Sequence, residues 1–127
     1  MAATSRSIGE LTSRMLRKQF YVILTRAQGA APEAIAQHLP AHLEYMIALE
    51  KAGTLFASGP FTEADGTQRG NGMSIVRAES EAQARKLAEA DPFFVAGLRT
   101  YEVRAWTVME GSVGLTVNFS DQTYSLA

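Results

Sequence analysis

QFYVILT, residues 19–25, is the stretch that decides the fold. β-branched and aromatic side chains dominate it, which predicts a strand. Successive side chains of a strand point to opposite faces of the sheet, and here both sets are largely apolar. One set is Phe20, Val22 and Leu24, and the other is Tyr21, Ile23 and Thr25. We therefore expect both faces of the sheet to be covered.

After this strand the pattern alternates between helix and strand. Pro40 is typical of the first turn of a helix, where its missing N–H costs nothing, and Gly53 is typical of the residue after a helix. We expect the main helix between them, with a short helical turn before it at residues 33–37. Ser80 and Gln83 match a capping box, in which each side chain satisfies a backbone N–H group, so a second helix begins there.

The remaining strands are recognised by their β-branched and aromatic content. They are residues 54–58, 73–77, 100–108 and 113–119. Gly59-Pro60 ends the first of them, because proline cannot donate to a sheet ladder. Residues 62–72 carry several glycines and are predicted to form a flexible loop. The second helix is expected to stop at residues 91–92, where an aspartate precedes a proline.

The order of elements is β-α-β-β-α-β with one extra C-terminal strand. This order predicts an α+β fold, a ferredoxin-like sheet with both helices on one face. The apolar residues expected on the uncovered face are Tyr21, Ile23, Phe56 and Val76. A sheet from a second subunit is the simplest cover for that face. We therefore expect a homodimer, with the last strand available to extend or exchange across it.

The chain has 127 residues, the usual length of one domain. We expect an N-terminal arm at residues 1–17, the ferredoxin-like domain at residues 18–108 and a C-terminal strand extension at residues 109–127. The arm mixes Ser and Arg with apolar residues at helical spacing. It is either a segment that packs on the domain or an organelle transit peptide, and Glu10 counts against the second interpretation.

Charge and composition exclude several classes of function. Twelve Lys and Arg against thirteen Asp and Glu leave a net charge of −1, whereas electrostatic binding to nucleic acid needs a concentrated positive surface. No apolar run approaches the ~18 residues of a membrane-spanning helix. The lack of cysteine excludes disulfides and thiol nucleophiles. We expect a cytoplasmic protein that binds a small molecule and has no nucleic-acid or membrane partner.

The two histidines are the first candidates for chemistry. His38 and His42 have the i, i+4 spacing of helical zinc sites, but a helix that begins at Pro40 leaves His38 outside it. No third ligand has suitable spacing, so we expect no metal. His42 would then lie in the first turn, where the helix dipole favours the neutral imidazole that a base needs. The alternative is a partly buried histidine that donates to a backbone carbonyl group.

Asp91 is the candidate partner of His42. In a β-α-β-β-α-β sheet the two helices run antiparallel, so the start of the first lies beside the end of the second. A pair formed there would let Asp91 fix the tautomer of His42 and raise its basicity. The alternative for Asp91 is a helix N-cap, because Pro92 follows it directly.

Two sets of motifs resemble the YCII-related (YciI-like) domain family. The first is Pro40-Ala41-His42-Leu43 with Ser58-Gly59-Pro60, and the second runs from Asn71-Gly72-Met73 through Asp91-Pro92-Phe93 to Tyr101-Glu102-Val103-Arg104. The resemblance implies a dimeric α+β barrel with a His–Asp site, which carries over to His42 and Asp91. One branch of that family acts as a dehydrochlorinase on chlorinated hydroxyquinol compounds. The arm, the extra strand and the loop at residues 62–70 depart from the family pattern.

We therefore expect a small-molecule enzyme, a lyase or isomerase without a cofactor. His42 would exchange a proton with a small enolisable or phenolic substrate while Asp91 orients it. Ser58, Gly59, Pro60 and Phe93 are the predicted substrate contacts. One alternative is a non-catalytic dimeric protein that binds a small ligand or serves as an accessory subunit. Another is a His–Asp hydrogen bond with a purely structural role.

Overall fold

The computed structural model describes residues 5–127, so the first four residues of the predicted arm lie outside the described part. The chain divides into two compact units. The larger is Gln19–Thr107, and the smaller joins the chain up to Lys18 to Val108–Ala127. Within the described residues, no helix is both long and apolar enough to cross a membrane.

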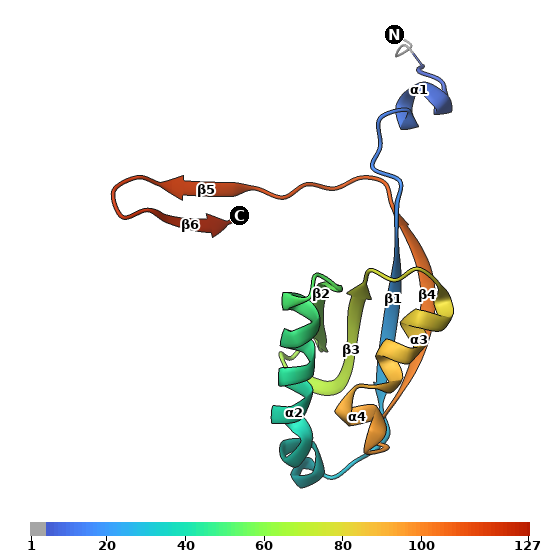
Figure 1. Ribbon diagram of the computed structural model, residues 1–127, viewed down its shortest axis with the longest axis vertical. Coiled ribbons are helices and arrows are strands. Elements are labelled where there is room, and N and C mark those ends of the chain that lie inside the picture. Colours follow the sequence, from blue (N-terminus) through green and yellow to red (C-terminus); the bar gives the residue numbers. More distant parts are fainter. Residues whose placement is uncertain (1–4) are drawn as a thin grey trace. The chain divides into compact units, whose positions relative to one another are not determined.

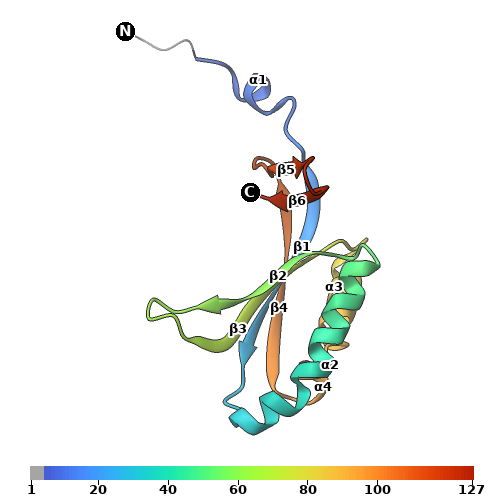
Figure 2. The same cartoon turned by 90° about the vertical axis from the view of Figure 1, so that its left-hand side faces the viewer.

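The larger unit is an α+β fold whose helices all lie on one side of a sheet (Figures 1 and 2). The sheet order is β2-β3-β1-β4, and β3 pairs antiparallel with both β1 and β2. Its strands are β1 (Lys18–Ala27), β2 (Leu55–Thr62), β3 (Gln68–Val76) and β4 (Arg99–Val108), and its helices are α2 (Pro32–Lys51), α3 (Glu81–Glu89) and α4 (Pro92–Val95). The predicted α+β class with an antiparallel sheet is confirmed.

The core lies between the sheet and the helices, and it corrects the predicted assignment of faces. Tyr21, Ile23 and Val76 are buried in one cluster with Ala84 and Ala88 of α3. They were expected on the uncovered face. Strand alternation shows which residues share a face, but because both faces are apolar it does not show which of the two the helices cover.

The opposite face of the sheet carries aromatic side chains. The Phe20 ring centroid lies 5.0 Å from that of Phe56 and 6.4 Å from that of Trp106. Arg77 contacts the rings of both phenylalanines. Phe20 is buried, whereas Phe56 and Trp106 are 51% and 42% exposed. This face therefore keeps exposed aromatic surface within the single chain.

Helix α2 is longer than predicted, because Pro40 lies inside it and not in its first turn. The helix begins instead at Pro32, which occupies the first-turn position that proline favours. An interior proline cannot donate to the carbonyl group four residues earlier and bends the helix there. Figure 2 shows that the early turns of α2 run at an angle to the rest. His38 and His42 consequently belong to one helix.

Strands β2 and β3 are also longer than predicted. Pro60 lies within β2, which continues to Thr62, and β3 begins at Gln68, so the loop between them shrinks to residues 63–67. β2 is at the edge of the sheet. A proline is tolerated on an edge strand because its missing N–H faces away from the neighbouring strand. The prediction that Gly59-Pro60 ends the strand is therefore wrong.

The start of α3 matches half of the predicted capping box. Ser80 Oγ accepts a hydrogen bond from the Gln83 N–H at 3.1 Å. The Gln83 side chain, however, accepts from the N–H of Glu79 at 2.6 Å and not from that of Ser80. The helix begins where the sequence predicted, and the reciprocal bond is displaced by one residue.

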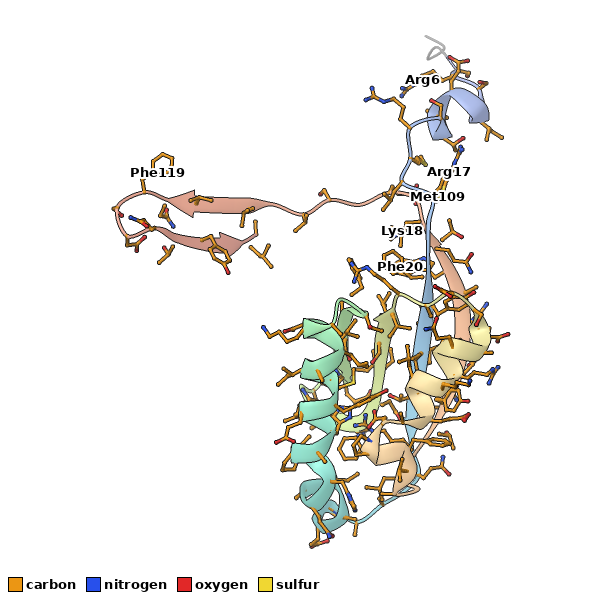
Figure 3. The ribbon with its side chains drawn as sticks, viewed as in Figure 1. Arg6, Arg17, Lys18, Phe20, Met109 and Phe119 are labelled. Carbon is orange, nitrogen blue, oxygen red and sulfur yellow. The ribbon has the colours of Figure 1, made fainter. Side chains whose placement is uncertain are left out.

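The smaller unit contains a short helix and a hairpin. Helix α1 (Ile8–Thr12) begins with a capping box between Ser7 and Glu10. Where one strand was predicted at residues 113–119, the structure has two antiparallel strands, β5 (Leu115–Asn118) and β6 (Thr123–Leu126). Figure 3 shows Phe119 at the turn of this hairpin. Its side chain is 93% exposed.

Candidate active site

The site centres on a direct contact between His42 of α2 and Asp91, the residue just before α4. His42 Nδ1 lies 2.8 Å from Asp91 Oδ1 and 3.0 Å from Asp91 Oδ2. The two side chains are only 14% and 13% exposed. A carboxylate can only accept hydrogen bonds, so Nδ1 carries the proton. Nε2 of a neutral His42 then keeps a free electron pair.

Asp91 serves two groups at once. As the N-cap of α4, its Oδ1 also accepts a hydrogen bond from the Phe93 N–H at 2.9 Å. The N-cap and the partner of His42 were alternative interpretations of this aspartate, and the structure contains both contacts. The carboxylate is held by backbone on one side and holds the imidazole on the other.

The helix dipole does not contribute to this site in the way the sequence suggested. Because α2 begins at Pro32, His42 lies in its third turn, away from the positive end of the dipole. The orientation of the imidazole comes from its neighbours. The ring of Phe93, which is 1% exposed, stacks on it with centroids 4.4 Å apart.

A pocket of about 780 Å³ opens beside the pair. Its apolar wall comes from α2, and the facing wall comes from β2 and β3. His42, Asp91 and the predicted contacts Ser58, Gly59, Pro60 and Phe93 all line it. The α2 side chains are Ile35, Leu39, Leu43, Met46 and Ile47. A cavity of this size and composition suits a small, largely apolar molecule.

Part of the wall formed by β2 and β3 consists of small residues, Ser58, Gly59, Gly72 and Ser74. Ser58 Oγ lies 2.8 Å from Ser74 Oγ, so the two hydroxyl groups share a hydrogen bond. A Cβ atom at Gly72 would lie 2.9 Å from the carbonyl oxygen of Gly59, which is too close for any side chain. The backbones of the two strands therefore form this part of the wall directly.

Tyr45 is a site neighbour that sequence reasoning missed. Its hydroxyl group donates to the Leu87 carbonyl at 2.7 Å, which ties α2 to α3. Burial, and to a lesser extent the negative charge of Asp91, raise the pKa of the phenol. The spacing from His42, three residues along one helix, was the signal that could have found it.

Arg99 is a second residue that was missed. It lines the pocket and its Cζ atom lies 4.3 Å from the Phe93 ring centroid. Burial lowers the pKa of its guanidinium group, and the charge of Asp91 partly offsets this. A lone arginine at the start of a strand carries no sequence signal for a site.

Arg69 and His38 lie outside the pocket. The Arg69 side chain is 68% exposed, and its Nε atom lies 3.9 Å from Glu63 Oε1. His38 does not line the pocket although it shares α2 with His42. Among residues 5–127 no group of three or more His, Cys, Asp or Glu side chains is arranged to hold a metal ion.

Comparison with known proteins identifies the family. A model of the YCII-related domain matches residues 19–107. This match spans more than half of the chain, so the chain belongs to the YCII-related domain family.

Two relatives extend the comparison. The uncharacterised protein YjpA of Bacillus subtilis (strain 168) is 27% identical over 70 residues, which are 55% of this chain and 76% of YjpA. Among solved structures, 5-chloro-2-hydroxyhydroquinone dehydrochlorinase (TftG) from Burkholderia phenoliruptrix AC1100, in complex with 2,5-dihydroxybenzoquinone, matches with a TM-score of 0.59 and 26% identity. That match covers 68% of this chain and 92% of the dehydrochlorinase.

Proposed function

We propose that this protein is a small-molecule enzyme that moves a proton on an enolisable or phenolic substrate, as a lyase or an isomerase does. The observation that carries the proposal is the His42–Asp91 pair at the wall of an apolar pocket. A partly buried carboxylate that fixes Nδ1–H leaves Nε2 as the proton acceptor. The similar solved structure, that of a 5-chloro-2-hydroxyhydroquinone dehydrochlorinase, supports a small-molecule enzyme.

In the proposed reaction, Nε2 of His42 takes a proton from a carbon or hydroxyl group of the substrate. The electron pair released forms an enolate or phenolate. In a lyase the enolate or phenolate then expels a leaving group. In an isomerase His42 returns the proton to another carbon of the substrate. Asp91 stabilises the imidazolium that forms, because its carboxylate already accepts from Nδ1. The Phe93 ring keeps the imidazole plane in place.

We further propose that Ser58, Gly59, Pro60 and Phe93 contact the substrate and that the active form is a homodimer. The small residues of β2 and the Phe93 ring line the same pocket as His42. The homodimer would cover the exposed aromatic surface of Phe56 and Trp106 on the face away from the helices.

The test is turnover of a panel of enolisable and phenolic compounds, chlorinated hydroxyquinols among them, followed by their ultraviolet absorbance. For a compound that wild type converts, His42→Gln should lower turnover by about 10²- to 10⁴-fold, the usual contribution of a general base. His38→Gln is the matched control, since it makes the same change four residues earlier on α2 and outside the pocket.

Two results would contradict the proposal. One is a folded His42→Gln variant with wild-type turnover. The other is a panel in which compounds raise the melting temperature of wild type but none is converted, which would favour a ligand-binding or accessory protein.

A further inference from the structure

The pocket contains a cation that the proposed proton transfer does not use. Arg99 is the first residue of β4, and its Nε atom is buried without a hydrogen-bond partner. No hydrogen bond or ion pair of its guanidinium group is found within residues 5–127. A buried donor without a partner is costly and rare in a folded protein, so a site that retains one needs a physical reason.

The neighbours of Arg99 hold the guanidinium group without neutralising it. The Phe93 ring, 4.3 Å from Cζ, offers a face that attracts a cation. Asp91 is the near carboxylate, but it forms no ion pair with Arg99 and already accepts from His42 and from the Phe93 N–H. The arginine is thus oriented by an aromatic ring, while its hydrogen-bonding capacity stays unused by the chain.

The same ring connects Arg99 to the candidate base. Phe93 stacks on the His42 imidazole at 4.4 Å and contacts the guanidinium group at 4.3 Å, and both residues line one pocket. A molecule that delivers a proton to His42 therefore lies near a positive charge. Such a charge stabilises negative charge on a substrate oxygen, both before and during proton transfer.

We propose that Arg99 binds an anionic oxygen of the ligand, a carboxylate or a phenolate carried on a small planar molecule whose other end faces His42. This inference rests on the proposed function, because it assigns the substrate class of the same pocket. Guanidinium groups bind such oxygens through charge-assisted hydrogen bonds, which are stronger than neutral ones. A neutral molecule of the same shape would leave the half-buried charge uncompensated.

The experiment compares benzoate with benzamide, two planar molecules of similar shape that differ in charge, by melting curves over a concentration series. Benzoate should raise the melting temperature of wild type, and benzamide should raise it much less. Arg99→Met should weaken the affinity for benzoate by roughly tenfold or more, the loss expected for charge-assisted hydrogen bonds. Arg99→Lys keeps the charge but not the planar guanidinium group, so its affinity for benzoate should lie between those of wild type and Arg99→Met.

Three controls separate this inference from its alternatives. Arg69→Met removes an equal charge from an exposed site outside the pocket and should leave the benzoate shift unchanged. Without ligand, Arg99→Met should melt no lower than wild type, because the variant no longer carries a half-buried charge with a buried, unpartnered Nε–H. His38→Gln, on α2 and outside the pocket, should also retain the benzoate shift. Turnover by His42→Gln tests the proposed function, and this shift tests Arg99.

The inference is overturned if benzoate does not stabilise wild type, or if Arg99→Met keeps the full benzoate shift. A variant that melts markedly lower and keeps that shift would assign Arg99 a structural role. If Arg99→Met does not fold, the inference is tested with Arg99→Lys. It is then overturned if benzoate stabilises Arg99→Lys as much as wild type and if benzamide stabilises wild type as much as benzoate does.

Discussion

The carboxylate group of Asp91 both caps a helix and contacts the candidate base. Asp91 accepts from the Phe93 N–H as the N-cap of α4 and from His42 Nδ1 across the site. An N-cap is a strongly local preference, whereas the contact with His42 depends on how the helices pack. The two roles place different demands on the residue, because capping needs an acceptor and proton transfer needs a negative charge.

Replacing Asp91 by Asn separates these roles. Asparagine caps helices about as well as aspartate, so the free energy of unfolding should change by less than about 1 kcal/mol. The amide lacks the charge that stabilises an imidazolium, so turnover of a substrate found in the panel should fall by about 10²-fold or more. Chemical denaturation and steady-state turnover measure the two effects.

Asp65→Asn is the matched control for that experiment. Asp65 lies in the exposed β2–β3 loop and does not line the pocket. Its Oδ1 atom accepts hydrogen bonds from the backbone N–H and the hydroxyl group of Thr67. Its substitution should leave turnover unchanged. Full turnover by Asp91→Asn would show that the charge at this position is not needed.

The His42–Asp91 part of the site could be predicted from the sequence. A carboxylate before a proline and a histidine on the facing helix are visible as residue types, and the order of elements brings their helices together. The guanidinium group of Arg99 and the Ser58–Ser74 hydrogen bond are different. Each depends on tertiary packing that brings an ordinary polar residue into the pocket, and no local pattern marks such a residue.

At the scale of elements, the differences from prediction concern prolines. Pro40 was interpreted as a helix start and Pro60 as a strand end, and each lies inside its element. Both interpretations used the local cost of a missing N–H group. The structure accommodates the missing N–H group in α2 by a bend and in β2 by the place of that strand at the sheet edge. Neither the bend nor the edge is readable from neighbouring residues.

The bend in α2 should cost measurable stability. Pro40→Ala restores the missing N–H and removes the steric clash with the preceding turn, so we expect the free energy of unfolding to rise by roughly 1–3 kcal/mol. Urea denaturation measures this change. Gln37→Ala, at an exposed position of the same helix, should change stability by only a few tenths of a kcal/mol. A less stable Pro40→Ala variant would show that packing requires the bend.

At the scale of the whole molecule, the face predicted to be uncovered was wrong for Tyr21, Ile23 and Val76, which lie in the core, whereas Phe56 lies with Phe20 on the opposite face. The strand at residues 19–25 is apolar on both sides, so only the position of the helices could decide which side forms the core. The pairing of β5 with β6 was missed for a related reason. β6 (Thr123–Leu126) has only four residues, so its alternation is too short to predict a strand alone.

The proposed homodimer makes a prediction about Trp106, which is 42% exposed on the face away from the helices. Trp106→Glu would place a charge in an apolar interface, so it should shift the protein to monomer in sedimentation velocity. Val95→Glu is the control, because Val95 is 73% exposed on α4 and should leave the assembly unchanged. A wild-type monomer, or an unaffected Trp106→Glu dimer, would contradict this interface.

The close approach of Gly59 and Gly72 limits how the pocket can diverge among relatives. No side chain fits at Gly72 while the Gly59 carbonyl oxygen stands 2.9 Å from its Cβ position. A larger residue at Gly72 would therefore require β2 to move. Leu39, Leu43 and Ile47 on the opposite wall are 40%, 48% and 53% exposed, so they can change size at little cost to folding. Changes of specificity should accumulate along this one helix, while Gly72 stays constant.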